Sequence, residues 1–255
     1  MNDLLQYNNW TIEQNTWAPE QEEDIQQKLT FSNGYICQTA HFEEHYSGAQ
    51  RLCTYIDGIE HPILNLSSIS IRLHDERLDM ATWQISQFYR CLHKNQPSLE
   101  RHFTATSPKG ATLQIKAKRH LLPQKEAILI EYEITSVNYK GPISFLSMLG
   151  ANEEKIDWYP LMNHIGQDHC WLWLQMHEIN IQLCCAMKWS VLSNGSPLIQ
   201  RPIKIEKQHT IGYSQITSIK PGDTCVLQKQ VVVMDSRTHD TEQLINDTVE
   251  CLTNL

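Results

Sequence analysis

Residues 41–45, HFEEH, bring two histidines and two glutamates into one short segment. The spacing fits H-x-x-E-H, the pattern in which two histidines one helical turn apart bind Zn²⁺ and the glutamate activates a bound water. That geometry requires a helix and a third ligand. The flanking SNGY and YSGA are typical of turns, and no third ligand is recognisable. We therefore expect no metal site, and a zinc peptidase is the least favoured of three functional hypotheses.

Glycosidase chemistry would need two carboxylates that flank one glycosidic bond. Glu43 and Glu44 are adjacent, as are the glutamates at 153–154, so the side chains of each pair diverge. The chain also lacks G-x-S-x-G, the P-loop pattern and G-x-G-x-x-G. Trp171 and Trp173 could stack on a sugar from one face of a strand, although core packing is the favoured interpretation. We therefore assign no catalytic residue.

The 255 residues carry a formal net charge of −8. Nucleic acids and anionic membranes attract basic surfaces, so we expect neither as a partner. The N-terminus, MNDLLQYNNW, lacks the basic and apolar regions of a signal peptide. No apolar run approaches the ~20 residues that span a bilayer. The eight cysteines have no framework spacing and fit free thiols in a reducing compartment. These features predict a cytoplasmic protein; a periplasmic location stays open for a chain whose signal was removed.

Period-two alternation identifies the elements that must position any site. In residues 111–120, Leu113, Ile115 and Ala117 face one way, and polar residues face the other. About a dozen such segments, separated by turn signals, predict a sandwich or a barrel. Helical periodicity is convincing only in residues 241–255. We therefore predict an all-β fold: a large antiparallel β-sandwich of two sheets with a C-terminal helix.

Two segments have a less regular pattern. Residues 10–17 predict a short strand, which Pro19 and the acidic run at 20–24 should end. The polar and mixed residues 152–168 predict a loop or a short helix.

The stretch FSNGYICQTAHFEEHYSGAQRLCTYIDGI resembles a segment near the start of family 65 glycoside hydrolases, which include maltose, kojibiose and trehalose phosphorylases. Members often read N-G-Y-x-G-x-R-x-N-F-E-E-x-Y-S-G and then G-T-Y-x-x-G. The matching positions here are Asn33, Gly34, Tyr35, Phe42, Glu43, Glu44, Tyr46, Ser47, Gly48, Thr54, Tyr55 and Gly58. FYRCLHKNQPSLERHF and KAKRHLL are similar to later motifs of the family and place Arg90, Arg101 and Arg119. The resemblance covers residues 28 to 240.

The resemblance implies a β-sandwich of the galactose-mutarotase type in residues 1–239, and the start of a linker helix in residues 240–255. The linker would lead to an (α/α)6 barrel outside these residues, which would carry the catalytic acid and the phosphate site. The chain alone would then be inactive and would hold no cofactor. Its expected partners are the barrel, α-glucoside sugars and a second copy of the chain in a homodimer. The first hypothesis is therefore the supporting domain of an enzyme that acts on maltose- or trehalose-type disaccharides by phosphorolysis or hydrolysis.

The second hypothesis is a free-standing carbohydrate-binding module. For either, the residues expected at the substrate or domain interface are Asn33, Tyr35, Glu43, Glu44, Tyr46, Arg101 and Arg119. Residues 31–58 would form the surface that meets the barrel, with Glu43 and Glu44 offering carboxylates to backbone amides or to the partner domain. The chain departs from the family pattern at Gln38, Ala40, His41 and Cys53, which leaves loop contacts with substrate in doubt.

Overall fold

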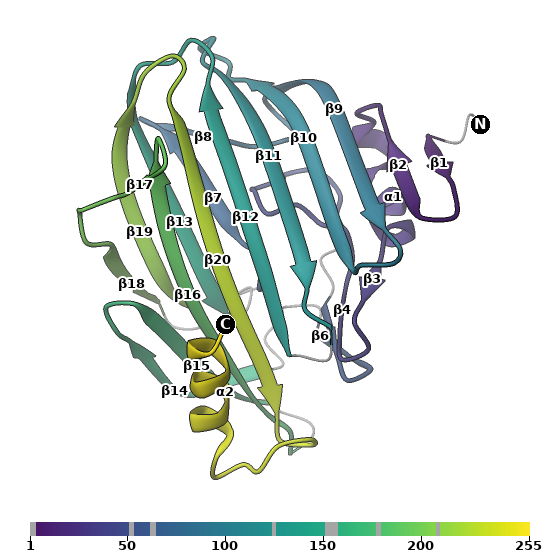
Figure 1. Ribbon diagram of the computed structural model, residues 1–255, viewed down its shortest axis with the longest axis vertical. Helices are drawn as coiled ribbons and strands as arrows, with labels where there is room; N and C mark the ends of the chain where they lie inside the picture. Colours follow the sequence, from purple (N-terminus) through teal and green to yellow (C-terminus); the bar gives the residue numbers. More distant parts are fainter. Residues whose placement is uncertain are drawn as a thin grey trace.

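The computed structural model describes residues 4–50, 54–61, 65–123, 126–150, 158–176, 180–207 and 210–255. A large sheet of eleven strands forms one layer (Figure 1). In spatial order its strands are β1 (Leu5–Tyr7), β2 (Thr11–Gln14), β9 (Gln84–His93), β10 (Ser98–Thr106), β11 (Thr112–Leu121), β12 (Ala127–Ser136), β20 (Thr224–Asp235), β16 (Gln182–Ser193), β15 (His169–Met176) and β14 (Trp158–Ile165), with β17 (Ser196–Pro197) paired to β16.

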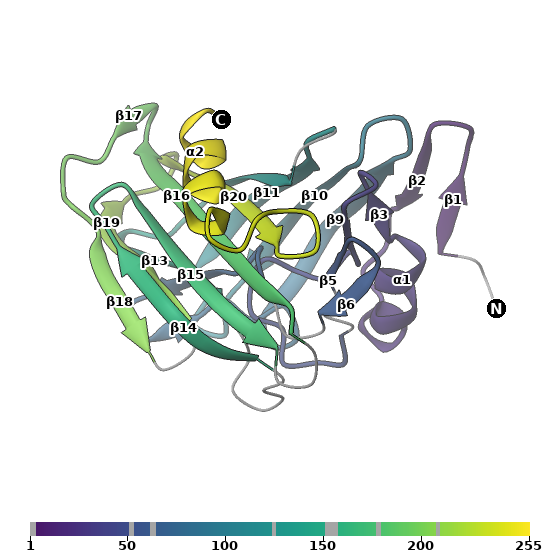
Figure 2. The same cartoon turned by 90° about the horizontal axis from the view of Figure 1, so that it is seen from below.

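A five-stranded sheet forms the second layer, behind the large sheet in Figure 1 and to one side of it in Figure 2. Its order is β18 (Ile203–Lys207), β19 (Thr210–Ile219), β13 (Gly141–Gly150), β7 (Ile69–Leu73) and β8 (Glu76–Arg77). A small sheet lies near the β9 side of the molecule, in the order β3 (Phe31–Ser32), β4 (Ile36–Gln38), β5 (Thr54–Ile56) and β6 (Ile59–His61). The pairings between these strands are antiparallel, and the predicted two-layer antiparallel sandwich is confirmed.

Alternation along the strands builds the core. In β11 the side chains of Leu113, Ile115 and Ala117 are buried, while the intervening polar residues are exposed. These inner faces join one hydrophobic core that both sheets share. Trp189 of β16 stacks on Tyr213 of β19, with ring centroids 6.0 Å apart, and so links the two layers. Trp171 and Trp173, the candidates for sugar stacking, are half-buried and pack against the apolar cluster that contains Ala186.

The C-terminal helix, α2 (Leu244–Thr253), covers part of the outer face of the large sheet. Leu244, Thr248 and Leu252 recur every fourth residue and are buried. They lie over a patch of small and apolar side chains formed by Ala127, Cys184, Ala186, Val232 and Met234. The sheet is therefore apolar on both faces at this place. As expected for neighbours in a strand, Cys184 and Cys185 face opposite sides: Cys185 joins the main core and Cys184 the patch under α2.

Two segments differ from the sequence-based prediction. The strand predicted at 10–17 is shorter, because β2 ends at Gln14, before the acidic run. The acidic run lies in a 3-10 turn (Pro19–Gln21) and a helix, α1 (Glu22–Lys28). Acidic side chains in the first turn stabilise the positive end of a helix dipole, and Ile25 and Leu29 anchor α1 in the core. Residues 158–165 are a strand, β14, rather than a loop or helix; residues 152–157 of that prediction lie outside the described part. No described helix is long and apolar enough to cross a membrane.

Candidate functional site

Three arginines project from neighbouring strands of the large sheet into the interior of the domain. Arg90 of β9 lies directly opposite Arg101 of β10, and Arg119 follows on β11. Each is at most 1% exposed. A buried cation is stable only when it is paired and hydrogen-bonded, so these arginines determine what must lie over this part of the sheet.

Glu43 and Glu44 supply two of the opposing charges. Nη2 of Arg101 contacts Glu43 and lies 2.6 Å from Oε2 of Glu44. Nε of Arg119 donates to Oε1 of Glu43 at 2.9 Å. The hydroxyl of Tyr132 donates to Oε1 of Glu44 at 2.5 Å. The expectation that these adjacent side chains diverge is therefore wrong, because both carboxylates contact Nη2 of Arg101.

Arg90 binds the third carboxylate, that of Glu22 on α1. Its Nη1 and Nη2 lie 2.8 and 3.1 Å from the two oxygens of Glu22, and Gln14 Oε1 accepts from Nη2 at 2.6 Å. The ring of Phe42 lies between two arginines, 5.6 Å from Arg90 and 4.8 Å from Arg101, in the range of a cation–π contact. The cluster thus joins α1 and residues 40–44 to the inner face of the large sheet.

The cluster is electrostatically balanced by three arginines and three glutamates. Burial alone would raise the pKa of Glu43, but the charges of Arg119 and Arg101 lower it to about 2. Burial lowers the pKa of His41 well below its usual value, with a further contribution from Arg119, so its imidazole is neutral. The Glu43 carboxylate is therefore ionised at neutral pH, where Arg101 and Arg119 both bind it.

This arrangement fits the anchoring of a loop better than catalysis or metal binding. The carboxylates of Glu43 and Glu44 already bind arginines and Tyr132, and the two side chains are at most 2% exposed. His41 is buried, His45 lies at an isolated bridge to Asp79, and residues 41–45 are not helical. The described residues contain no group of three or more side chains suited to a metal ion. The zinc peptidase hypothesis is wrong, because its helix does not form.

The remaining sequence-predicted residues fix the hairpin and the turn on either side of the cluster. Asn33 Oδ1 accepts from the backbone N–H groups of Tyr35 and Ile36, at 3.1 and 2.8 Å, and its amide donates to Leu122 O at 2.7 Å. The Tyr35 hydroxyl lies 3.4 Å from Oδ2 of Asp235. Asn33 and Tyr35 therefore tie the β3–β4 hairpin to the large sheet.

Tyr46 and Gly48 form the turn that follows the cluster. The Tyr46 hydroxyl donates to Pro19 O at 3.3 Å, and the Ser47 N–H donates to Asp79 Oδ1 at 3.1 Å. The Tyr46 ring lies so close to Gly48 that a Cβ at residue 48 would be 2.4 Å from it. Ser47 is exposed. Residues 45–50, which we call the clamped turn, therefore present a fixed backbone at the surface.

The sequence-based selection brought together Glu43, Glu44, Arg101 and Arg119, but these side chains are buried in the domain instead of forming a surface. It missed Arg90 and Glu22 as members of the cluster. The signal for Arg119 was present, because alternation in β11 places it on the same face as Leu113 and Ile115. Glu22 gave no such signal, since its helix was not predicted.

Residues 12–255 match the family model described as "Glycosyl hydrolase family 65, N-terminal domain". The chain belongs to glycosyl hydrolase family 65. Among curated relatives, it is 26% identical over 179 residues to the alpha,alpha-trehalose phosphorylase of Thermoanaerobacter brockii, a match that covers 60% of this chain and 23% of that one. It is 25% identical over 171 residues to the maltose phosphorylase of Bacillus subtilis, covering 58% and 22% of the two chains.

The fold of this family 65 domain also matches a solved structure from the human microbiome that carries the name of a kojibiose phosphorylase. The TM-score is 0.85 at 17% identity, and the match covers 98% of this chain and 36% of that one. At this identity the match establishes the fold. The chain spans about a fifth of the length of the curated relatives that it matches.

Proposed function

We propose that this domain supports the catalytic domain of a family 65 enzyme that acts on maltose- or trehalose-type α-glucosides by phosphorolysis or hydrolysis. The family match over residues 12–255 carries the proposal. The names of the relatives, all phosphorylases of α-linked glucose disaccharides, favour this substrate class. The catalytic domain would bind the sugar and inorganic phosphate, and the domain described here would hold no cofactor.

The clamped turn at residues 45–50 is the part of the candidate site that we assign to contact with the catalytic domain. Its neighbours Glu43 and Glu44 are fixed from below by Arg101 and Arg119. The glutamates would thus act by positioning the turn, while the exposed backbone and Ser47 would make the contact. An interface residue held in place before binding loses less conformational entropy on association. A buried ion cluster that holds the turn in place would therefore favour binding to the catalytic domain.

A chimeric enzyme tests the proposal. Residues 12–255 replace the corresponding domain of the Bacillus subtilis maltose phosphorylase, and phosphate-dependent cleavage of maltose is measured. We expect the chimera to be active, the catalytic part without any sandwich domain to be inactive, and the isolated chain to release no glucose from maltose or trehalose. Turnover of either disaccharide by the isolated chain would refute a purely supporting role.

Two further aspects belong to the same proposal. We place the protein in the reducing cytoplasm, where the cysteines that the structure describes, all of them free thiols, would stay reduced. We also assign a homodimer to the complete enzyme. Sedimentation of the chimera at several concentrations checks the second point, since a monomer at all concentrations would contradict it.

A further inference from the structure

Polar side chains form two parallel rows across the outer face of the large sheet. One row runs through Glu100, Lys118, Glu131, Gln228 and Ser190, which are cross-strand partners in turn. The other row, one step closer to α2, runs through Ser98, His120, Leu129, Gln230 and Lys188. Cross-strand partners on one face lie about 5 Å apart. Apart from the apolar Leu129, the two rows therefore form a dense array of hydrogen-bonding groups.

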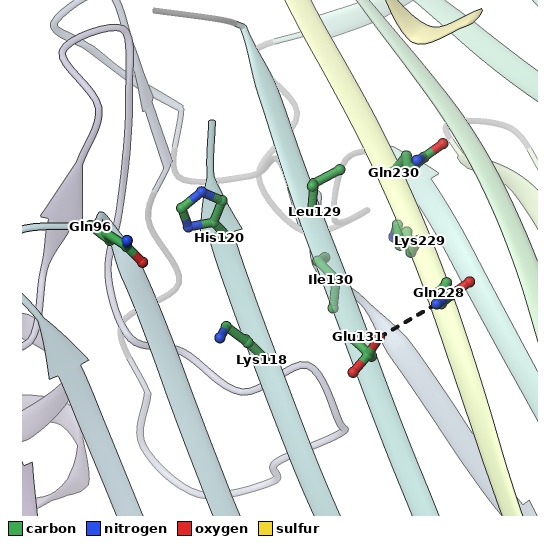
Figure 3. Close-up of a pocket in the computed structure, with 9 residues that line it drawn as sticks. All are labelled: Gln96, Lys118, His120, Leu129, Ile130, Glu131, Gln228, Lys229 and Gln230. Atoms are coloured by element: carbon green, nitrogen blue, oxygen red, sulfur yellow. Dashed lines mark hydrogen bonds between the residues drawn. The ribbon is translucent and has the colours of Figure 1, made fainter. Parts of the chain in front are cut away.

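A shallow hollow, open to solvent, lies along the two rows. A cavity of about 430 Å³ lies over β11, β12 and β20 (Figure 3). We call it the outer groove, and the side chains that matter for it are Lys118, His120, Leu129, Glu131, Gln228 and Gln230. Two smaller hollows of about 150 and 220 Å³ share residues with it. Pockets for small ligands have volumes of roughly 300–1,000 Å³, so the outer groove has the size for one.

The charges around the outer groove largely cancel. Lys118 Nζ lies 2.8 Å from Glu100, and Lys116 Nζ lies 2.8 Å from Glu133. Glu131 keeps its carboxylate at the groove and accepts only a long bond, 3.4 Å, from the Gln228 amide. A phosphate or an acidic peptide would therefore face a carboxylate without a surplus of cations. This balance favours an uncharged ligand.

Several hydrogen-bonding groups in the outer groove have no partner within the described part of the chain. Gln230 is half-buried, and neither its amide oxygen nor its amide nitrogen is engaged there. Burial and the charge of Lys118 lower the pKa of His120, so its neutral ring offers one donor and one acceptor. Leu129 supplies an apolar floor between them. Paired donors and acceptors beside a small apolar surface suit a ring that carries several hydroxyl groups.

A protein partner fits the outer groove less well. Protein interfaces draw most of their binding energy from large apolar or aromatic anchors in central pockets. Apolar side chains of this face gather beneath α2, and Leu129 is the outward-facing apolar side chain among the described residues that line the outer groove. We infer that the outer groove binds a short, uncharged glycoside through hydrogen bonds to Glu131, His120 and Gln230.

This site lies on the face opposite the buried arginine cluster, because Glu131 and Gln228 alternate along their strands with the buried Tyr132 and Lys229. The inference rests on the proposed function in one respect, the choice of maltose and trehalose as the sugars to test. Among the described lining residues the imidazole of His120 is the one ring that could stack on a sugar. Hydrogen bonds must then carry the binding, and we expect a dissociation constant on the order of 1 mM.

Amide spectra of the isotopically labelled chain, titrated with maltose and with trehalose, test the site. Bound sugar should shift the amide signals of residues 118–120, 129–131 and 228–230. Gln230→Ala and Glu131→Ala should each weaken binding about tenfold, the effect of one good hydrogen bond. Gln114→Ala is the matched control, because Gln114 is exposed on β11 and does not line the outer groove.

Two results would overturn the inference. One is the absence of shifts at these residues up to about 50 mM sugar, far above the expected dissociation constant; the other is equal weakening by Gln114→Ala. Sodium phosphate is titrated in parallel, and shifts with phosphate but not with sugar would identify an anion site instead. The chimera described above is independent of this test. If the chimera is active but sugar causes no shifts, the groove site is refuted and the supporting role stands. If sugar causes shifts but the chimera is inactive, the supporting role is refuted and the groove site stands.

Discussion

Arg101 and Glu44 form an ion pair of 2.6 Å in which both side chains are at most 1% exposed. Removing one partner of such a pair leaves an uncompensated buried charge, which typically destabilises a protein by about 3–5 kcal/mol. We therefore expect Arg101→Ala to lower the free energy of unfolding by about this amount, because Glu44 and Glu43 both lose a cation. Urea unfolding at pH 7, followed by tryptophan fluorescence, measures the change.

The matched control is the exposed pair of Lys109 and Asp75, whose atoms approach to 2.9 Å. Water and salt screen a pair at the surface, so Lys109→Ala should leave the unfolding curve unchanged. Equal effects of the two substitutions would show that the buried cluster contributes nothing special to stability.

Glu43 makes the stability of the domain depend on acid pH. Its folded-state pKa of about 2 lies below the ordinary value of 4.5, so the unfolded chain binds a proton at higher pH than the folded one does. The stabilisation by Glu43 is complete above about pH 5 and is lost as the pH falls from 4.5 towards 2. Glu43→Gln should therefore destabilise the domain most at neutral pH.

Urea unfolding of the wild type and of Glu43→Gln, at pH values from 7 down to 3, checks this dependence. The difference between the two proteins should shrink as the pH falls. A constant difference over this range would contradict the depressed pKa and would assign the effect to packing alone.

Alternation along the strands predicted the sandwich. It also indicated that one arginine of the cluster points inward, but it did not identify the partner of that arginine. Arg119 falls in phase with Leu113, Ile115 and Leu121 along β11, and an inward arginine requires a buried carboxylate. Its partner Glu43 is 76 residues away in the chain. The pairing of such distant residues depends on how the loop crosses the sheet, which periodicity within one strand does not specify.

The elements that were not predicted have weak local signals for physical reasons. Helix α1 has seven residues and buries Ile25 as its one apolar side chain, so tertiary contacts rather than an amphipathic pattern hold it. Strand β14 lies at the edge of the large sheet and contains Pro160 beside a register shift. Edge strands tolerate proline and exposed polar residues, and this removes the alternation on which the prediction relied.

Lys229 makes the stability of the domain depend on pH in a second range, above neutrality. Its ammonium donates to Met148 O at 3.0 Å and Ser68 O at 3.2 Å, but burial lowers its pKa to about 7. Between pH 7 and 10.5 the unfolded chain therefore binds more protons than the folded one. The free energy of unfolding should rise with pH across this window.

Lys229→Met keeps the length of the side chain and removes the titrating group. We expect the variant to lose this rise, with the largest gain in stability over the wild type near pH 7. Unfolding by urea at pH 7, 8 and 9 measures both slopes. Parallel slopes in the two proteins would show that Lys229 stays protonated in the folded state.

Leu252 is 1% exposed beneath α2, where it faces the patch that contains Val232 and Ala186. Truncation of a buried leucine to alanine typically costs about 2–5 kcal/mol, and partial relaxation of the site reduces this cost. Because α2 lies at the outside of the sheet, we expect Leu252→Ala to destabilise by about 2–3 kcal/mol and to expose α2 to protease before the sandwich unfolds. Limited proteolysis distinguishes local detachment of α2 from global unfolding, and Asn246→Ala, at an exposed position of α2, is the control. Cleavage at the same rate in both variants would contradict the predicted detachment.

Gly48 links the buried cluster to the proposed interface through its contact with Tyr46. A Cβ at residue 48 would lie 2.4 Å from the Tyr46 ring, so Gly48→Ala must displace the ring and break its hydrogen bond to Pro19. We expect a loss of about 1–3 kcal/mol from this overpacking, together with reduced activity of the chimera. In a Tyr46→Ala background the ring is gone, so the stability effect of Gly48→Ala should nearly vanish. Equal effects in both backgrounds would place the strain elsewhere, and a chimera that stays fully active despite a displaced ring would remove the clamped turn from the domain interface.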